Sequence, residues 1–187
     1  QSILVFCLYG QNSSSATDVP NPKSSGDSYV SDPDDMLTQD EENYLNSLLL
    51  DLENTTTNEF GVVVVNSIGD EIPKDYVHEL FNSWGVGKAG KDNGLLMLVV
   101  MDQRRIEVET GYGMEPVLPD VLVKNVQLVE MIPHFKDGNP NLGIKRGVEA
   151  YCKIMKEPEN VDLIASYRVA EVPSNYWDDV NLKLFIV

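Results

Sequence analysis

Residues 84–115 read W-G-V-G-K-A-G-K-D-N-G-L-L-M-L-V-V-M-D-Q-R-R-I-E-V-E-T-G-Y-G-M-E, and this stretch decides the fold. The apolar run at residues 95–101 is too short for a helix of its own and is typical of a strand buried on both faces. A polar turn at residues 102–104 ends the run, and residues 106–110 then alternate apolar or hydroxyl side chains with glutamates. The pattern predicts a hairpin with one buried strand and one wetter strand.

The hairpin has a consequence for the two loops at its open end. Because the strands run antiparallel, the start of the first, Asp92-Asn93-Gly94, must lie beside the end of the second, at residues 109–113. We therefore expect two glycine-rich loops with carboxylates to meet at one end of the sheet. Asp102 lies at the opposite end, where it is expected only to form the turn.

The residues before the hairpin predict two helices and a strand. Thr38 and Glu41 match a capping box that opens a leucine-rich helix. The β-branched run at residues 61–65 reads as a buried strand, and Pro73 opens the next helix. The expected inner face of that helix is Val77, Leu80, Phe81 and Trp84. Strand, helix and strand in this order predict a right-handed βαβ unit with parallel strands.

Two more helices are expected after the hairpin. One starts near Pro119-Asp120 and stops before Pro133, and the next runs from about Pro140 to Met155. The expected inward residues of the first are Leu122, Val126, Val129 and Ile132. Together the pattern predicts an α/β fold in which helices flank both faces of a small mixed sheet.

The chain divides by composition into three parts. Residues 1–28 combine an apolar run with a polar stretch, which predicts a signal-peptide remnant and a linker; a buried first strand is the alternative. Residues 29–156 hold the periodic pattern of one domain. Residues 157–187 form a C-terminal extension whose apolar end, at 182–187, is either docked on the domain or leads into a membrane anchor beyond residue 187. The protein is thus expected to be exported.

The charge of the chain limits its partners. Fourteen Lys and Arg residues against thirty Asp and Glu give a formal net charge of −16 across 187 residues. Nucleic acid is excluded as an expected partner, because binding to phosphates needs a basic face. Cations, metal ions and basic proteins are the expected partners of such an acidic field. The alternative is that the acidity only keeps the protein soluble.

Carboxylates on glycine loops are the candidate functional groups. The sequence holds no nucleophile elbow, no phosphate-binding loop and no dinucleotide fingerprint. The two histidines, His78 and His134, have no second histidine or thiolate at ligand spacing. Several oxygens held by tight turns suit Ca²⁺ or Mg²⁺ better than zinc. The alternative is that these acids only cap turns and helices, as Asp120 is placed to do. The candidates are Asp92, Glu109, Glu115 and Asp120, with Asp32 as an outlier.

These residues resemble those of a known family, the TPM domain, named for a thylakoid lumen protein, a photosystem II repair protein and a nematode modulator of acetylcholine receptors. The resemblance covers about residues 29–155. The matching motifs are Tyr29-Val30-Ser31-Asp32, Trp84-Gly85-Val86-Gly87, Lys91-Asp92-Asn93-Gly94, Glu109-Thr110-Gly111-Tyr112-Gly113-Met114-Glu115 and Leu118-Pro119-Asp120.

The resemblance implies a three-layer α/β/α sandwich on the periplasmic or extracellular side of a membrane, commonly tethered by a C-terminal helix, as in bacterial members. It also implies divalent-cation binding by loop acids, with Asp92 and Glu109 as the first candidates, followed by Asp32, Glu115 and Asp120.

Two functions follow as hypotheses. The first is a cation-binding accessory protein that contacts a membrane protein or membrane-associated complex. The second is a metal-dependent acid phosphatase acting on phosphomonoesters, assisted by Arg104 or Lys91. The acidic field and the lack of an evident nucleophile favour the first.

Overall fold

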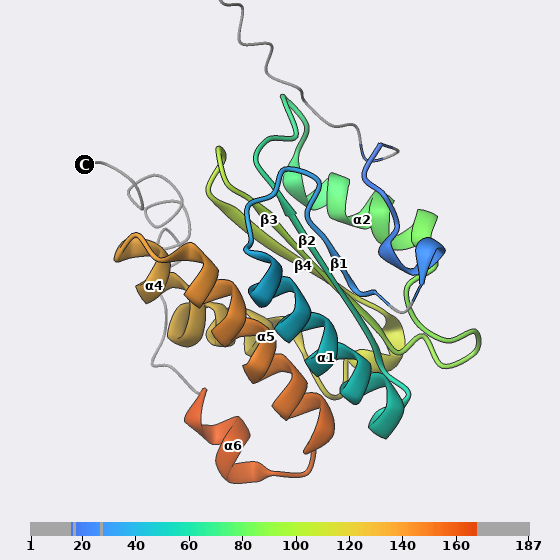
Figure 1. Ribbon diagram of the computed structural model, residues 1–187. Helices are drawn as coiled ribbons and strands as arrows, with labels where there is room; N and C mark the ends of the chain where they lie inside the picture. Colours follow the sequence, from blue (N-terminus) through green and yellow to red (C-terminus); the bar gives the residue numbers. More distant parts are fainter. Residues whose placement is uncertain (1–15, 17, 27, 168–187) are drawn as a thin grey trace, which may run out of the picture.

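The computed structural model in Figure 1 describes residue 16, residues 18–26 and residues 28–167. In the described chain, η1 and η2 are 3₁₀-helices and η3 is a π-helical segment. The elements in chain order are η1 (Pro22–Ser25), β1 (Val30–Ser31), α1 (Gln39–Thr56), β2 (Glu59–Val65), α2 (Pro73–Trp84), β3 (Gly94–Val100), β4 (Arg105–Thr110), η2 (Tyr112–Met114), α3 (Asp120–Val126), η3 (Gln127–Met131), α4 (Ile132–Lys136), α5 (Pro140–Lys156) and α6 (Val161–Ser166).

The described strands form one open sheet in the order β1-β2-β3-β4. β1 and β3 both run parallel to β2, whereas β4 runs antiparallel to β3. The predicted βαβ unit is therefore confirmed as β2-α2-β3, and the predicted hairpin as β3-β4. Helix α2 covers one face of the sheet, and α1, α4 and α5 lie on the other (Figure 1). The fold is the expected α/β/α sandwich on a small mixed sheet.

The two central strands are buried on both faces. Successive side chains of a strand point to opposite faces, so Val62 and Val64 pack in the layer of α1 and α5, whereas Val63 and Val65 pack in the layer of α2. Every residue of β3 is likewise buried. All six residues of β4 are only half-buried, which makes it the wetter strand that the alternation predicts.

Helix α1 begins at the predicted capping box. The Thr38 Oγ1 accepts a hydrogen bond from the Glu41 amide at 3.3 Å, and the Glu41 carboxylate accepts one from the Thr38 amide at 2.8 Å. These two bonds satisfy amides that have no partner within the helix. Leu45, Leu49 and Leu52 are buried along one stripe of the helix.

The helix after the hairpin differs from the prediction in one turn. Val129 was expected inward, but its side chain is 42% exposed, and Met131 is fully enclosed. The cause is the π-helical segment η3, in which the Ile132 amide donates to the Gln127 carbonyl, five residues back. The wider turn rotates the later positions, so α-helical spacing misplaces Val129.

The compact unit extends beyond the predicted residues 29–156 at both ends. Val19 is 4% exposed and packs in the layer of α2, although the composition of residues 1–28 predicts a linker. Leu163 and Tyr167 are buried in the layer of α1 and α5, so α6 belongs to the core as well. The sequence did not reveal these segments because each is anchored by only a few apolar side chains within polar surroundings.

The apolar runs at residues 2–8 and 182–187 lie outside the described residues, so the signal-peptide remnant and the membrane anchor stay predictions. Across the described segments, no helix combines the length and the apolar character needed to cross a membrane.

Four charged side chains fasten the N-terminal segment to the domain. Lys23 of η1 lies 2.7 Å from Glu53 of α1 and 3.2 Å from Glu59 of β2, between Nζ and a carboxylate oxygen in each pair. Lys88, from the loop before β3, pairs with the same two glutamates. Burial raises the pKa of Glu53, but hydrogen bonds, chiefly from Lys23 and Lys88, outweigh burial and lower the pKa from 4.5 to about 2.

Replacing Glu53 with Gln tests this network. Because the folded-state pKa of Glu53 lies below its ordinary value, the carboxylate stabilises the fold above pH 4.5, and this contribution is lost as the pH falls toward 2. We expect Glu53→Gln to lower the free energy of unfolding by about 1 to 2 kcal/mol at pH 7, a value reduced for solvent screening. Urea unfolding at several pH values should show this difference shrinking toward zero near pH 2.

Glu159→Gln is the control, because Glu159 is exposed and forms no ion pair with the described residues. It should change the free energy of unfolding by less than about 0.5 kcal/mol at each pH. An equal loss at every pH for Glu53→Gln contradicts the assignment.

Candidate binding groove beside the edge strand

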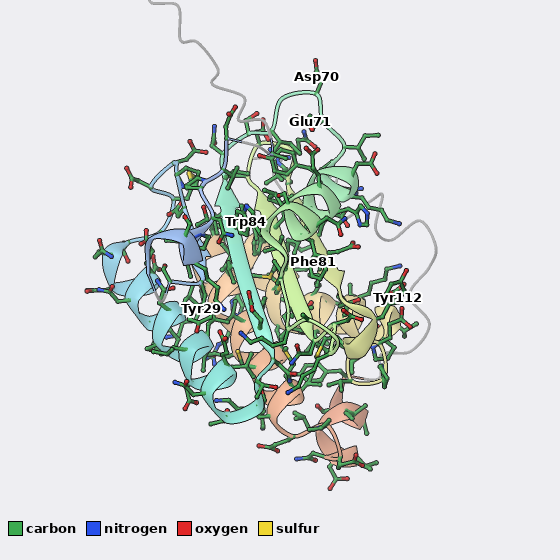
Figure 2. The ribbon with its side chains drawn as sticks, turned by 90° about the vertical axis from the view of Figure 1, so that its right-hand side faces the viewer. Tyr29, Asp70, Glu71, Phe81, Trp84 and Tyr112 are labelled. Carbon is green, nitrogen blue, oxygen red and sulfur yellow. The ribbon has the colours of Figure 1, made fainter. Side chains whose placement is uncertain are left out.

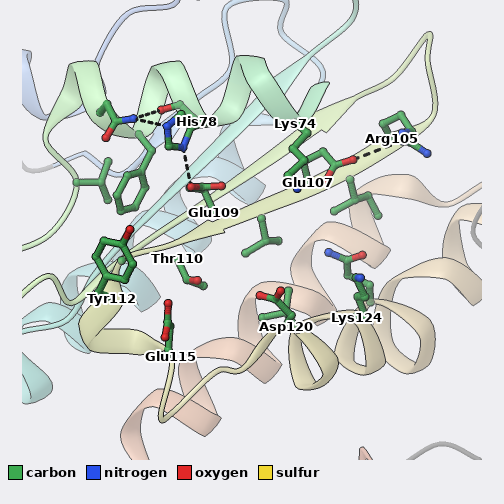
Figure 3. Close-up of a pocket in the computed structure, with 18 of the residues that line it drawn as sticks. Lys74, His78, Arg105, Glu107, Glu109, Thr110, Tyr112, Glu115, Asp120 and Lys124 are labelled. Carbon is green, nitrogen blue, oxygen red and sulfur yellow. Dashed lines mark hydrogen bonds and ion pairs between the residues drawn. The ribbon is translucent and has the colours of Figure 1, made fainter. Parts of the chain in front are cut away.

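A groove of about 880 Å³ follows β4, and every residue of that strand lines it. Figure 3 shows Lys74 and His78 of α2 on one side of the strand, and Asp120 and Lys124 of α3 on the other. The groove exists because β4 is the last strand of the sheet, and α2 and the α3-η3-α4 segment flank its outer edge.

Two glycine loops close one end of the groove by direct backbone contact. The Gly111 amide donates to the Gly94 carbonyl at 2.9 Å, and the Gly113 amide donates to the Asp92 carbonyl at 3.0 Å. A Cβ on Gly111 would lie 2.1 Å from the Asp92 carbonyl oxygen, and one on Gly113 would lie 1.9 Å from that of Lys91. Only glycine permits this approach. The predicted meeting of the two loops is thus confirmed.

Four of the predicted acids line the groove together: Asp92, Glu109, Glu115 and Asp120. We call these four residues the acidic end. Asp92 sits in a left-handed backbone conformation with φ of 49°, which is uncommon outside glycine, and its side chain is exposed. Glu115 and Asp120 are exposed as well, and Figure 3 shows them on the side of the groove opposite α2.

Asp32 does not join this group. It follows β1, and because β1 and β3 run in the same direction, it lies at the end of the sheet opposite Asp92. Its carboxylate accepts hydrogen bonds from the amides of Met36 at 3.0 Å and Leu37 at 2.6 Å, which shapes the loop before α1. Burial raises the pKa of Asp32, and these hydrogen bonds partly oppose the shift. The structure thus gives Asp32 a structural role apart from the groove.

His78 is a partner of Glu109 that the sequence did not reveal. Its Nδ1 lies 2.8 Å from Glu109 Oε1, and its Nε2 lies 3.0 Å from Asn82 Nδ2. Asn82 Nδ2 also donates to the His78 carbonyl at 2.9 Å, which fixes the orientation of the amide. These bonds assign the proton to Nδ1, so the imidazole donates to Glu109 and accepts from Asn82.

Glu107 is a second residue that the sequence analysis passed over. It shares a strand face with Glu109, two residues away, and therefore also faces the groove. Burial raises the pKa of Glu107, and Arg105, Lys74 and Lys124 oppose the shift. The Arg105 guanidinium lies 3.6 Å from the Glu107 carboxylate. We call Lys74, Arg105 and Lys124 the basic end of the groove. The strand periodicity was the signal that could have identified Glu107.

The described residues contain no set of three or more His, Cys, Asp or Glu side chains placed to hold a metal ion. The acidic end therefore offers oxygen ligands without a preformed cage, on three exposed side chains and on Glu109, which is half-buried and bonded to His78. The groove thus has three parts. Strand β4 alternates charged and apolar side chains along it, Ile106 and Val108 form its apolar side, and its two ends carry opposite charge.

Comparisons with known proteins agree with this architecture. The TPM domain matches residues 30–154. The N-terminal domain of a P. gingivalis protein, solved by NMR, is 38% identical with a TM-score of 0.71 and covers 76% of this chain and 91% of its own. The BA42 protein of the psychrophilic bacterium Bizionia argentinensis shares the fold at 22% identity and a TM-score of 0.56, over 67% of this chain and 86% of its own. No curated protein matches the sequence. The α/β/α domain belongs to the TPM domain family.

The glycine contact that closes the groove can be tested by adding one methyl group. We expect Gly113→Ala to lower the free energy of unfolding by about 2 to 3 kcal/mol, because its Cβ would overlap the Lys91 carbonyl and the backbone must shift. Chemical denaturation measures the change. The control is Tyr112→Ala, because Tyr112 is 82% exposed and projects toward solvent (Figure 2). Comparable losses in both variants contradict the proposed contact.

Proposed function

We propose that this TPM domain is an accessory module that binds a divalent cation, Ca²⁺ or Mg²⁺, at the acidic end of the groove and contacts a membrane protein or membrane-associated complex. The supporting observation is that Asp92, Glu109, Glu115 and Asp120 line one groove. Within the described chain, none of these carboxylates forms an ion pair with Lys or Arg. Glu109 accepts a hydrogen bond from His78, and the charges of Asp92, Glu115 and Asp120 are left for a ligand.

The chemistry of the donors suits a hard cation held through water. Mg²⁺ commonly binds proteins through one or two carboxylates and keeps several of its waters, so it does not need three protein ligands. Asp92 and Glu109 are the first candidates, because the backbone contact of the glycine loops holds their segments together. Without a preformed cage we expect weak binding, with a dissociation constant of about 10⁻⁴ to 10⁻³ M.

The proposed location is the periplasmic or extracellular side of a membrane, with an anchor beyond residue 187. This part of the proposal rests on the apolar runs at residues 2–8 and 182–187 and on the family resemblance. The net charge of −16 supports protein or cation partners and disfavours nucleic acid.

Calorimetric titration of chelator-treated protein with Ca²⁺ and Mg²⁺ tests the cation site. We expect saturable binding that weakens at least tenfold in Asp92→Asn and Glu109→Gln. Asp102→Asn is the matched control, because Asp102 occupies the turn at the far end of the hairpin and should leave the affinity unchanged. Equal weakening by all three substitutions, or no heat of binding, rules out this site.

A metal-dependent acid phosphatase is the second candidate function, and Glu107 is the observation that favours it. A carboxyl group with a raised pKa can protonate the leaving oxygen of a phosphomonoester while water attacks phosphorus. Lys74, Arg105 and Lys124 stand beside it, where they can neutralise phosphate oxygens. A divalent cation would supply further charge neutralisation when bound.

Turnover of p-nitrophenyl phosphate by the pure full chain tests this activity. Because the protonated acid is the active form, turnover should fall as the pH rises through the pKa of Glu107. Glu107→Gln should lower turnover by about 10² or more and leave cation binding in place. Unchanged turnover in that variant attributes the activity to a contaminant.

A further inference from the structure

The outer edge of β4 presents unpaired backbone groups to the groove. In an antiparallel pair, residues alternate between those that bond to the partner strand and those that point away. The Gly111 amide bonds to Gly94, and the register continues with Leu96 opposite Glu109 and Leu98 opposite Glu107. The backbone groups of Arg105, Glu107 and Glu109 therefore face β3.

The N–H and C=O groups of Ile106, Val108 and Thr110 face outward instead. β4 pairs only with β3 in the described sheet, and no described group bonds to these three amides. All three residues line the groove. An exposed row of this kind is a template for another strand. The edge is also long enough, because six strand residues span about 20 Å.

The two walls of the groove differ in chemistry. On the side of α1 and α5, Ile106 and Val108 pack against the apolar core. Val123 and Phe135 of the α3-η3-α4 segment belong to this core and also line the groove. On the side of α2, the strand presents Glu107 and Glu109. A strand added at this edge would place alternate side chains against an apolar wall and against carboxylates.

We propose that β4 binds an extended, basic segment of a partner protein by adding it to the sheet as a fifth strand, with apolar and basic side chains in alternation. The apolar side chains pack toward Val108 and Phe135, and the basic side chains lie beside Glu109 and the other carboxylates of the acidic end. This partner class rests on the accessory role proposed above and gives it a binding mode. Main-chain hydrogen bonds supply affinity in such complexes, and alternate side chains supply specificity.

The charge of the edge makes it selective. Charged side chains on an edge strand discourage indiscriminate pairing. Here Glu109 and the acidic end oppose an acidic side chain and favour a basic one, because side chains on neighbouring strands of one face interact directly. The charge of Glu107 is already opposed by Arg105, Lys74 and Lys124. The net charge of −16 also attracts basic segments to the molecule. A second copy of this acidic chain is disfavoured by the same field.

Amide hydrogen exchange on the full chain, followed by NMR, tests the proposal. The probe is a blocked hexapeptide that alternates lysine and valine. In the free protein, the amides of Ile106, Val108 and Thr110 should exchange faster than those of Glu107 and Glu109. Saturating peptide should slow the first set at least tenfold. A hexapeptide with three lysines followed by three valines keeps the composition but loses the alternation, and it should give no such protection.

Val108→Pro supplies a matched variant. It removes an outward amide and spares the bonds to β3, which are made by the neighbouring residues. We expect it to weaken binding of the alternating peptide at least tenfold, whereas Val108→Thr, which keeps the amide, should bind normally. Glu109→Lys gives a second readout if the proline variant does not fold, because charge reversal should weaken binding of the lysine peptide and strengthen binding of its glutamate counterpart.

Several results overturn the proposal. Equal binding of both lysine peptides without amide protection shows attraction by charge alone. Protection of the outward amides in the free protein shows that another segment occupies the edge. Protection that depends on protein concentration assigns this role to a second copy, and protection that does not assigns it to the chain's own residues 168–187. The peptide experiments are run with EDTA, and cations are titrated separately without peptide. Failure to bind the peptide therefore leaves the proposed cation site standing, and failure to bind a cation leaves the proposed peptide site standing.

Discussion

Burial of β2 and β3 on both faces is the constraint on which the rest of the structure depends. Strands that are apolar on both sides need a helical layer on each face, and α2 covers one face while α1 and α5 cover the other. β4 carries apolar side chains on one face only, so it can occupy the border of the sheet but not its centre. The groove is therefore a direct result of where the apolar residues lie along the chain.

The local parts of this arrangement could be predicted from the sequence because their signals are local. The apolar run of β3, the alternation in β4 and the glycines that flank them define the hairpin, and antiparallel geometry then brings Asp92 and Glu109 to the same end. Gly111 and Gly113 allow the backbones to touch there. Two glycine-rich loops at a hairpin end are thus enough to locate a candidate site.

The remaining features depend on packing between elements, which periodicity does not encode. His78 and Glu109 are brought together only by the placement of α2 across β4. Asp32 fell outside the site because the parallel order of β1, β2 and β3 carries it to the other end of the sheet. The raised pKa of Glu107 depends on burial, which α2 and α3 create by flanking β4. Glu109 stands beside both proposed ligands, so a cation and a basic side chain would compete for its oxygens.

The π-helical segment η3 shapes the wall of the groove opposite α2. Five α-helical steps turn by about 500°, which leaves residue i+5 about 140° away from residue i. In η3, a bond across five residues closes a full turn, so Gln127 and Ile132 can both line the groove. Deleting a single residue here would rotate the apolar part of the wall, but it would also displace Met131, which is fully enclosed against Gly147 of α5. The binding surface and the stability of the fold are therefore coupled through this one helical turn, because it supplies side chains to both the groove and the core.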